Sequence, residues 1–410
     1  MTGLNPKQHA WMRGADITAL FKAFPEDKLR FVGGCVRNAL MDVDVGDIDL
    51  ATQLEPKDVE SALKSASIKY VPTGIDHGTI TAVIDRKPFE ITSLRKDVET
   101  DGRRAVVSYT QDWAEDAQRR DLTMNALYAG FDGHVYDPTG QGLDDLKAMK
   151  FRFVGEADMR VQEDYLRILR YFRFLAWYGG AAKVDAQALK ACRENRCGLK
   201  KLSAERVWSE IKKILSAPDP SRAIHIMLTN EILDTVLPEA SNSDGLSRLV
   251  KLEGREALTP DPLLRLMAMS AREPLQMALL CKRLKMSSKE TQRLRAWSDS
   301  SAALDPHAEN KEQLKSIYLA GKEIVSDRSQ IRAAGEDDAI VSGRWMSLAK
   351  LAQEWAVPEF PLSGKDMQAA GVKPGPQMGK MLEALKALWV RSGFTADREK
   401  LLMALKLINR

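Results

Sequence analysis

The sequence of 410 residues is poor in the residues that build disulfide frameworks and common zinc sites. Its four cysteines, Cys35, Cys192, Cys197 and Cys281, form no CxxC pair and no cysteine–histidine cluster with zinc-like spacing. Only five histidines are present, and none lies in an HExxH motif or a His-Asp dipeptide. The commonest zinc-hydrolase and His-Asp phosphohydrolase motifs are therefore absent, and we expect four reduced, incidental thiols.

Long apolar segments are also lacking. No run of eighteen apolar residues is present, so the sequence predicts no membrane-spanning helix. Residues 1–20 include Lys7, His9, Arg13 and Asp16 and show no apolar signal core. We expect a cytoplasmic protein with no membrane partner.

What the sequence does contain is typical of a globular protein, with 44% hydrophobic and 29% charged residues. The length predicts two or three domains with a substantial core. The net charge of +4 is unevenly distributed, because residues 1–150 carry −5 and residues 151–410 carry +9. An acidic first part followed by a basic remainder fits a metal-using site joined to a surface that holds a polyanion.

The pattern of apolar residues predicts an α+β fold. Strand patterns occur at residues 29–32, 47–50, 78–84 and 89–94 and in the strand pair 125–136. Residues 85–88 are expected to join strands 78–84 and 89–94 in a hairpin. A polar stretch, 96–118, predicts a long mobile loop. After residue 150 the apolar spacing becomes helical, as in residues 161–178.

Two short segments have the pattern of a nucleotide and metal site. Residues 33–37 (GGCVR) follow a predicted strand, and their Gly-Gly turn lets backbone N–H groups approach phosphates. Asp47 and Asp49 are two residues apart in the next predicted strand, so their side chains share a face. Paired carboxylates suit Mg²⁺, which completes its coordination shell with water and phosphate oxygens. An Asp-x-Asp pair alone is often only a solvated strand edge, but here it follows strand, Gly-Gly turn and helix in order.

With these residues the sequence resembles the nucleotidyltransferase superfamily that includes DNA polymerase beta. More narrowly, it is similar to the class II tRNA nucleotidyltransferase and poly(A) polymerase family. The resemblance extends over residues 30–215 and rests also on 119–127 (RRDLTMNAL), 163–170 (EDYLRILR), 203–210 (SAERVWSE) and the position of the stretch 96–118. Asn38 stands where the family usually has Asp, which bears only on a secondary salt bridge.

The resemblance implies a palm-like head with a mixed β-sheet over residues 1–150, followed by a helical neck (151–216), body (217–305) and tail (306–410). It implies Asp47 and Asp49 as catalytic Mg²⁺ ligands. The implied nucleotide-binding residues are Gly33, Gly34, Arg37, Arg119, Arg120, Asn125, Asp164, Arg167 and Arg170.

Residues 161–178 are expected to form one helix that reads the incoming base. Glu163, Asp164, Arg167 and Arg170 would then form one polar edge, because positions i, i+3, i+4 and i+7 share a helix face. CTP and ATP each present an amino donor beside a ring-nitrogen acceptor. An aspartate acceptor next to an arginine donor complements both bases, whereas UTP and GTP reverse the pattern. The alternative is a solvated stripe of ion pairs.

Other residues are expected in supporting roles, each with a plain structural alternative. Glu90 either supports the metal site or lies on a solvated sheet face. The resemblance implies that Glu205 and Arg206 brace the base-reading helix, but they could also only follow the helix cap at Ser203. Glu163 is expected to be a further supporting residue. Lys373 and Lys380 either bind RNA phosphates or flank a glycine-rich linker.

The predicted activity is addition of CMP and AMP, from CTP and ATP, to the 3′ end of tRNA. A poly(A) polymerase shares these motifs, and enzymes adding only CC or only A remain alternatives. A catalytically silent RNA-binding protein would not need the paired carboxylates. A nucleotidyltransferase acting on an antibiotic would lack the long basic helical part. The oligomeric state is left open.

Overall fold

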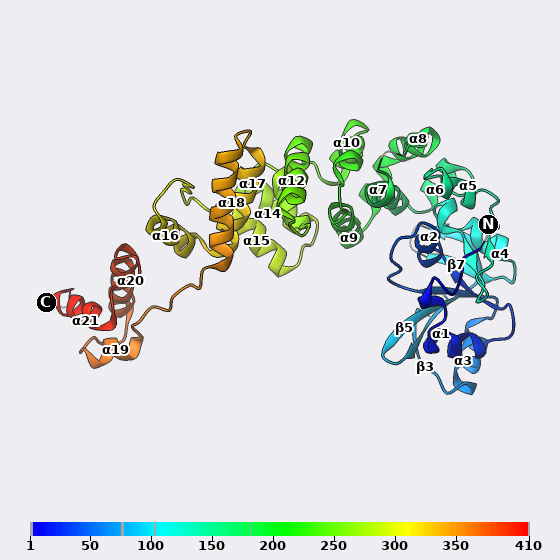
Figure 1. Ribbon diagram of the computed structural model, residues 1–410, viewed down its shortest axis with the longest axis horizontal. Coiled ribbons are helices and arrows are strands. Elements are labelled where there is room, and N and C mark those ends of the chain that lie inside the picture. The colour runs from blue at the N-terminus through cyan, green and yellow to red at the C-terminus, as the bar shows by residue number, and fades with distance from the viewer. Residues whose placement is uncertain (1–2, 75–77, 102–103, 181, 409–410) are drawn as a thin grey trace. The chain divides into compact units, whose positions relative to one another are not determined.

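The structure is a computed structural model that describes residues 3–74, 78–101, 104–180 and 182–408 (Figure 1). The chain divides into two compact units, Met1–Pro238 and Glu239–Arg410. Each unit is considered by itself. The four predicted domains stay predictions.

The first unit contains a seven-stranded mixed sheet with the strand order β3-β4-β5-β2-β1-β8-β9. β2 and β5 are parallel, and the other neighbouring pairs are antiparallel. The strands of this sheet are β1 (Leu29–Val32), β2 (Asp49–Thr52), β3 (Lys69–Gly74), β4 (Thr79–Ile84), β5 (Lys87–Ser93), β8 (Tyr128–Ala129) and β9 (Val135–Tyr136). The mixed sheet predicted for the head is thereby confirmed.

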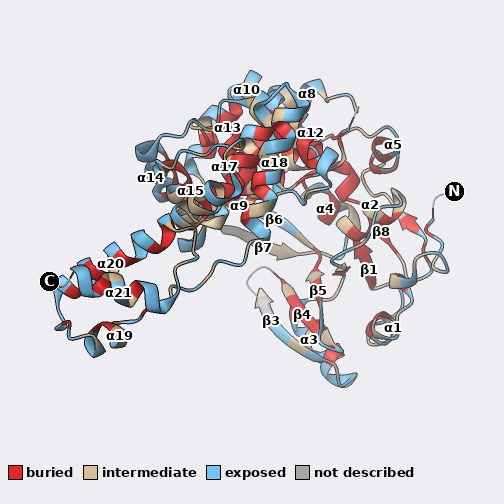
Figure 2. Ribbon diagram, turned by 60° about the vertical axis from the view of Figure 1, so that its left-hand side comes forward, coloured by how far each residue is buried: buried red, intermediate tan, exposed pale blue. Residues whose placement is uncertain are grey.

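Local sequence explains the central strands. Phe31 of β1 and Leu50 of β2 are fully buried and pair across the sheet. Consecutive residues are buried in both strands, so both faces of the sheet are covered here, and Figure 2 draws β1 mainly as buried. β4 and β5 form the predicted hairpin, and its turn residues Asp85 and Arg86 both have positive φ angles. Such a two-residue turn matches the right-handed twist of the strands.

The predicted long loop at residues 96–118 is wrong. The segment forms a separate two-stranded sheet of β6 (Arg95–Asp101) and β7 (Arg104–Tyr109), followed by helix α4 (Trp113–Gln118). Antiparallel pairing satisfies the backbone N–H and C=O groups of both strands, so a segment with many polar residues can still form a sheet. Asp112 caps α4 by accepting a hydrogen bond from the N–H of Ala114.

The single helix predicted for residues 161–178 is also wrong. Helix α6 (Ala157–Glu163) ends at Asp164, whose backbone is extended, and α7 (Leu166–Tyr178) begins after Tyr165. The Asp164 carboxylate accepts a hydrogen bond from the N–H of Leu166 at 3.0 Å. Aspartate competes in this way with helical backbone hydrogen bonds and ends the helix. The helical spacing of the apolar residues continues across Asp164 and therefore gave no sign of the break.

The first unit contains further helical segments, and several of them pack on one another. They are η1 (Ala10–Met12), α1 (Ala15–Lys22), α2 (Gly34–Leu40), α3 (Pro56–Ser65), η3 (Thr123–Asn125), α5 (Gly142–Lys147), α8 (Ala186–Glu194), η4 (Arg196–Lys201), α9 (Ala204–Leu215), α10 (Ser221–Thr229) and α11 (Ile232–Val236).

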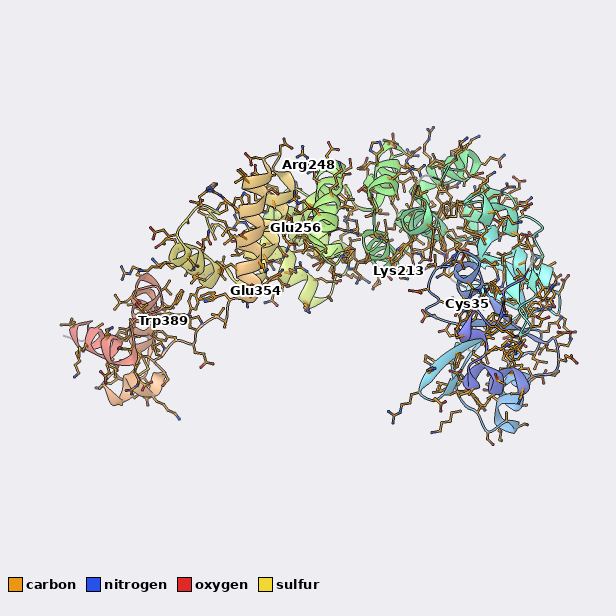
Figure 3. All side chains as sticks on the ribbon, viewed as in Figure 1. Cys35, Lys213, Arg248, Glu256, Glu354 and Trp389 are labelled. Carbon is orange, nitrogen blue, oxygen red and sulfur yellow. The ribbon has the colours of Figure 1, made fainter. Side chains whose placement is uncertain are left out.

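In its described residues the second unit is helical. Its helices are α12 (Ser243–Glu256), α13 (Pro262–Met269), α14 (Pro274–Arg283), α15 (Ser288–Asp299), α16 (Asn310–Ala320), α17 (Lys322–Gly335), α18 (Ala339–Glu354), α19 (Gly364–Ala369), α20 (Pro376–Arg391) and α21 (Arg398–Ile408). Trp389 of α20 is buried in an apolar cluster of this unit (Figure 3). Across the described part of the chain, no helix is both long and apolar enough to span a bilayer.

Candidate active site

A cavity of about 1080 Å³ lies in the first unit beside α2, β2 and α7. Nine basic and four acidic side chains line it, together with Phe174, Trp177 and Tyr178. This excess of positive charge favours a polyanionic ligand. The lining includes most of the predicted site residues: Gly33, Gly34, Arg37, Asp47, Asp49, Arg119, Arg120, Asn125, Asp164, Arg167, Arg170 and Arg206.

The Gly-Gly turn joins β1 to α2, as predicted. Gly33 has a φ of 72°, a left-handed conformation that glycine adopts without strain. Its N–H donates to the carbonyl of Leu127. The turn therefore fixes α2 against the start of β8 and places Gly34 at the cavity wall.

Arg37 of α2 is buried and held on several sides. Its guanidinium donates to Asn125 Oδ1 at 2.5 Å and to the Tyr178 hydroxyl at 2.9 Å. It also donates to Asn38 Oδ1 at 2.7 Å. Asparagine thus keeps the hydrogen bond that a carboxylate would make, but leaves the charge of Arg37 without an ion-pair partner at this position.

Asp49 is the first residue of β2, whereas Asp47 precedes the strand in a bend. The prediction that both carboxylates lie on one strand is therefore wrong, although both line the cavity. Burial raises the pKa of Asp49, repulsion from Glu90 and Asp47 adds to the increase, and Arg120 opposes it. Glu90 is exposed and pairs with Asp49 in the parallel register of β5 and β2.

Arg119 and Arg120 are positioned by one carboxylate that the sequence interpretation missed. Asp116 of α4 is buried and accepts from Arg119 Nε at 2.7 Å, from Arg120 Nη2 at 3.0 Å and from the Tyr128 hydroxyl at 2.6 Å. Burial acts to raise the pKa of Asp116, but the attraction of Arg120 and Arg119 outweighs it and holds the pKa at about 2. The i, i+4 spacing to Arg120 was a signal for this pair.

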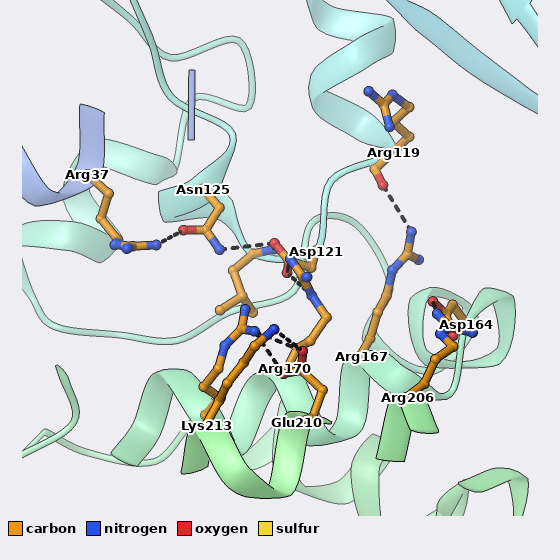
Figure 4. Close-up of polar contacts among 12 residues, drawn as sticks. Arg37, Arg119, Asp121, Asn125, Asp164, Arg167, Arg170, Arg206, Glu210 and Lys213 are labelled. Carbon is orange, nitrogen blue, oxygen red and sulfur yellow. Dashed lines mark hydrogen bonds and ion pairs between the residues drawn. The ribbon is translucent and has the colours of Figure 1, made fainter. Parts of the chain in front are cut away.

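A second missed carboxylate is Asp121. It accepts from Arg170 Nε at 2.7 Å and from Asn125 Nδ2 at 3.0 Å (Figure 4). Burial acts against ionisation, but the Arg170 charge and these hydrogen bonds hold the pKa of Asp121 well below its usual range. Asn125 thereby connects Asp121 to Arg37 in one buried chain of polar contacts.

The polar residues around the helix break form ion pairs. Asp164 accepts from Arg206 of α9 at 2.7 Å. Arg167 of α7 pairs with Glu163 and donates to the carbonyl of Arg119 at 3.0 Å (Figure 4). Asp164 and Arg167 both line the cavity, whereas Glu163 is an ion-pair partner beside it.

Five of the predicted supporting residues stand apart from the lining of this cavity. Glu90, Glu163 and Glu205 belong to the same unit but are not among the described residues that line it. Lys373 and Lys380 belong to the second unit, where both are exposed. No group of three or more His, Cys, Asp or Glu side chains placed to hold a metal is found among the described residues.

Comparisons with known proteins give a consistent result. Residues 29–152 match the poly A polymerase head domain, and residues 183–243 match a probable RNA and SrmB binding site of polymerase A. Residues 263–405 match the second domain of tRNA nucleotidyltransferases. A mouse (Mus musculus) relative, CCA tRNA nucleotidyltransferase 1, mitochondrial, is 36% identical over 405 residues, covering 95% of this chain and 89% of the relative.

Solved structures extend the similarity to the whole fold. The Bacillus stearothermophilus CCA-adding enzyme in complex with CTP has a TM-score of 0.73 at 26% identity, covering 99% of this chain and 98% of the other. The Thermotoga maritima CCA-adding enzyme complexed with tRNA has a TM-score of 0.63 at 16% identity, covering 96% and 98%. At that identity the second likeness bears on the fold alone.

Proposed function

Because this chain belongs to the family of CCA-adding tRNA nucleotidyltransferases, which share their head domain with poly(A) polymerases, we propose that it adds CMP and AMP to the 3′ end of tRNA. The nucleotides come from CTP and ATP, and pyrophosphate is released. One observation carries the assignment: a single basic cavity brings together the Gly-Gly turn, Asp47, Asp49, the Arg119–Arg120 pair and Asp164 with Arg167.

The family is typically metal-dependent, and the carboxylates of this cavity fit a divalent cation such as Mg²⁺. The raised pKa of Asp49 reflects burial and mutual repulsion with Glu90 and Asp47, which a bound cation would relieve. Asp47 and Asp49 would hold the ion, with phosphate oxygens and water completing its shell. Bound there, Mg²⁺ supplies charge stabilisation for the attacking 3′ hydroxyl and the leaving pyrophosphate.

The basic side chains are placed to bind the triphosphate. Arg119 and Arg120 are fixed by Asp116, so their guanidinium groups need little reorganisation to meet phosphate oxygens. Arg37 is turned toward Asn125 and Tyr178, and we propose that it positions α2 rather than grips phosphate directly. The tRNA 3′ hydroxyl would attack the α-phosphate held between these groups and the carboxylates.

Base selection is assigned to Asp164 and Arg167. The Asp164 carboxylate is held on one side by the Leu166 N–H and on the other by Arg206, so its acceptor position is preorganised. Arg167 is fixed by Glu163 and the Arg119 carbonyl. This pair complements the amino and ring-nitrogen groups shared by cytosine and adenine.

Poly(A) addition is the second candidate, because the head-domain match carries that description. The match of residues 263–405 to a tRNA nucleotidyltransferase domain favours CCA addition. The cytoplasmic location expected from the sequence stays a prediction.

The deciding experiment is to sequence the products formed from tRNA lacking its terminal CCA with all four nucleotides present. We expect CCA to be added and synthesis to stop there. A run of A would support poly(A) addition instead, and products ending after CC, or an A added only to tRNA that already ends in CC, would show a partial enzyme. A matched incubation with tRNA that already ends in CCA should yield no product.

A further inference from the structure

The cavity extends beyond the residues assigned to the incoming nucleotide. Its volume of about 1080 Å³ slightly exceeds the roughly 300–1000 Å³ typical of sites for one small ligand. Along α7 the lining continues from Arg167 through Arg170 and Arg173 to Trp177 at helical spacing. At 1.5 Å per residue, Trp177 lies ~15 Å along the helix from Arg167. That is several times the ~3.4 Å spacing of neighbouring nucleotides in a strand.

Trp177 is unusual on this helix because it is 43% exposed, whereas Tyr171 and Phe172 of α7 are fully buried. Its indole Nε1 donates to the carbonyl of Lys213 on α9 at 2.8 Å. This bond holds the ring by one edge while much of the residue stays accessible to solvent. A large aromatic ring that is both anchored and exposed is a preorganised stacking surface.

Basic groups surround this end of the cavity. Arg173 contacts the buried Glu210 at 2.8 Å. Lys213 contacts the same carboxylate at 3.2 Å (Figure 4). Two cations share one anion, so a net positive charge remains. The Lys213 side chain is 53% exposed, so its ammonium group is accessible to a ligand.

We propose that the C-terminal half of α7, with Lys213 of α9, is the subsite for the single-stranded 3′ end of the tRNA, and that the terminal bases stack on Trp177. This inference rests on the proposed function. In CCA addition the growing end is the base that precedes CCA in the first round and a cytosine in the next two, so a subsite that reads base edges would reject some of these ends. Stacking tolerates any base, and the cations hold the backbone.

The test compares Trp177→Ala, Trp177→Phe and, as a matched control, Met159→Ala, which removes an exposed apolar side chain of α6 outside the cavity. Initial rates are measured against tRNA concentration at saturating CTP, and the CTP dissociation constant is measured without tRNA. We expect Trp177→Ala to lower kcat/KM for tRNA about tenfold, the scale of one stacked base. Trp177→Phe keeps a ring and should stay within about threefold of the wild type. CTP binding should be unchanged in all three variants.

Several results would overturn the subsite. Equal kcat/KM for tRNA in Trp177→Ala and the wild type would do so directly. Loss of CTP affinity together with tRNA affinity, or an equal loss in Trp177→Phe, would show that the indole hydrogen bond merely holds α7 to α9. A wild type that adds no nucleotide to tRNA would refute the proposed function itself, whereas a fully active wild type with an unaffected Trp177→Ala refutes the subsite alone.

A second variant covers the case in which Trp177→Ala does not fold. Lys213→Gln removes one exposed cation, and we expect the slope of log affinity for tRNA against log salt to become shallower by about one. An unchanged slope would contradict the role of Lys213 and, with it, the subsite.

Discussion

At the scale of single residues, the proposed mechanism depends on Asp47 and Asp49 as metal ligands. We predict that Asp47→Ala or Asp49→Ala slows nucleotide addition by at least ~10³. The bound cation stabilises the transition-state charge by several kcal/mol, and each ~1.4 kcal/mol lost slows the rate tenfold. Binding of tRNA should persist, since its phosphates contact other parts of the chain. Turnover and filter binding are measured at saturating Mg²⁺.

The matched control for these variants is Asp58→Asn, which neutralises an exposed carboxylate of α3. We expect it to retain normal turnover. A residual activity above a tenth of the wild type in either alanine variant would show that the assigned carboxylates are not the metal ligands.

In the proposed mechanism, Asp164 selects the base through its acceptor oxygens. Asp164→Asn places an amide where one oxygen now meets Arg206, and the amide can turn to donate to the carbonyl of uracil. We predict that UTP incorporation rises and CTP incorporation falls, within the roughly tenfold to hundredfold range of one paired contact. Steady-state rates are measured with each nucleotide on tRNA lacking CCA.

Arg206→Gln is the companion variant, because it removes the contact that holds Asp164 but keeps its charge. Rates with CTP and ATP should fall together, without a gain in UTP use. If Asp164→Asn keeps the CTP-over-UTP preference of the wild type, the base is read elsewhere and Asp164 serves only to cap α7.

The sequence allowed most of these residues to be named but not their partners. Arg170 and Asp121 are 49 positions apart in the sequence, and Asn125 and Arg37 are 88 positions apart. Such pairs depend on how elements fold together, and local spacing does not encode them. The Asp116–Arg120 ion pair could have been predicted from the sequence, because the two residues are four positions apart and lie at the end of a helix.

At the scale of elements, helix α4 positions Arg119 and Arg120 through its buried residue Asp116. We predict that Asp116→Asn lowers the free energy of unfolding by ~3 kcal/mol, because it leaves two arginines without their buried counter-charge. The CTP dissociation constant should also rise. Denaturant unfolding and equilibrium CTP binding measure the two effects. Glu115→Gln, an exposed change on the same helix, is the control and should affect neither by a comparable amount.

The same carboxylate predicts a pH dependence. The pKa of Asp116 is held at about 2, below the ~3.9 of an unfolded aspartate, so its contribution to stability is complete above pH ~4 and is lost as the pH falls toward 2. The stability difference between the wild type and Asp116→Asn should therefore narrow over that range. A difference that stays constant down to pH 2 would contradict the assignment.

The predicted elements succeeded where side-chain pattern alone determines structure. The turn at Gly33 and the β4–β5 hairpin were foreseeable because glycine and a short polar turn leave few alternatives. The β6–β7 pair was missed because only β7 carries a short apolar run, AVV at 105–107, whereas β6 is polar and pairs through its backbone. The break at Asp164 was missed because one side-chain hydrogen bond to Leu166 outweighs a continuous apolar period.

At the scale of the whole molecule, the charge is distributed unevenly along the chain. The cavity of the first unit combines carboxylates with an excess of arginine, and the chain from residue 151 onward is basic by nine charges. All four cysteines are unpaired, so the fold depends on apolar packing rather than on cross-links. In the second unit this packing includes Trp389 and the aromatic rings of Tyr318, Phe360 and Phe394 around it. The basic surface is thus free to serve binding.

We predict that tRNA binding weakens steeply with salt, because we expect the basic residues after 150 to contact phosphates and so to release counterions. Lys373→Gln and Lys380→Gln, both at exposed positions of the second unit, should each make the log–log slope shallower by about one. Lys350→Gln is the control, because Lys350 is exposed but lies 3.8 Å from Glu354 on the same helix, and its slope should match the wild type. A wild-type affinity for tRNA that does not change as the salt concentration rises several-fold would refute binding through phosphates. If the wild type depends on salt but Lys373→Gln and Lys380→Gln leave the slope unchanged, the RNA contacts lie on other residues of the chain.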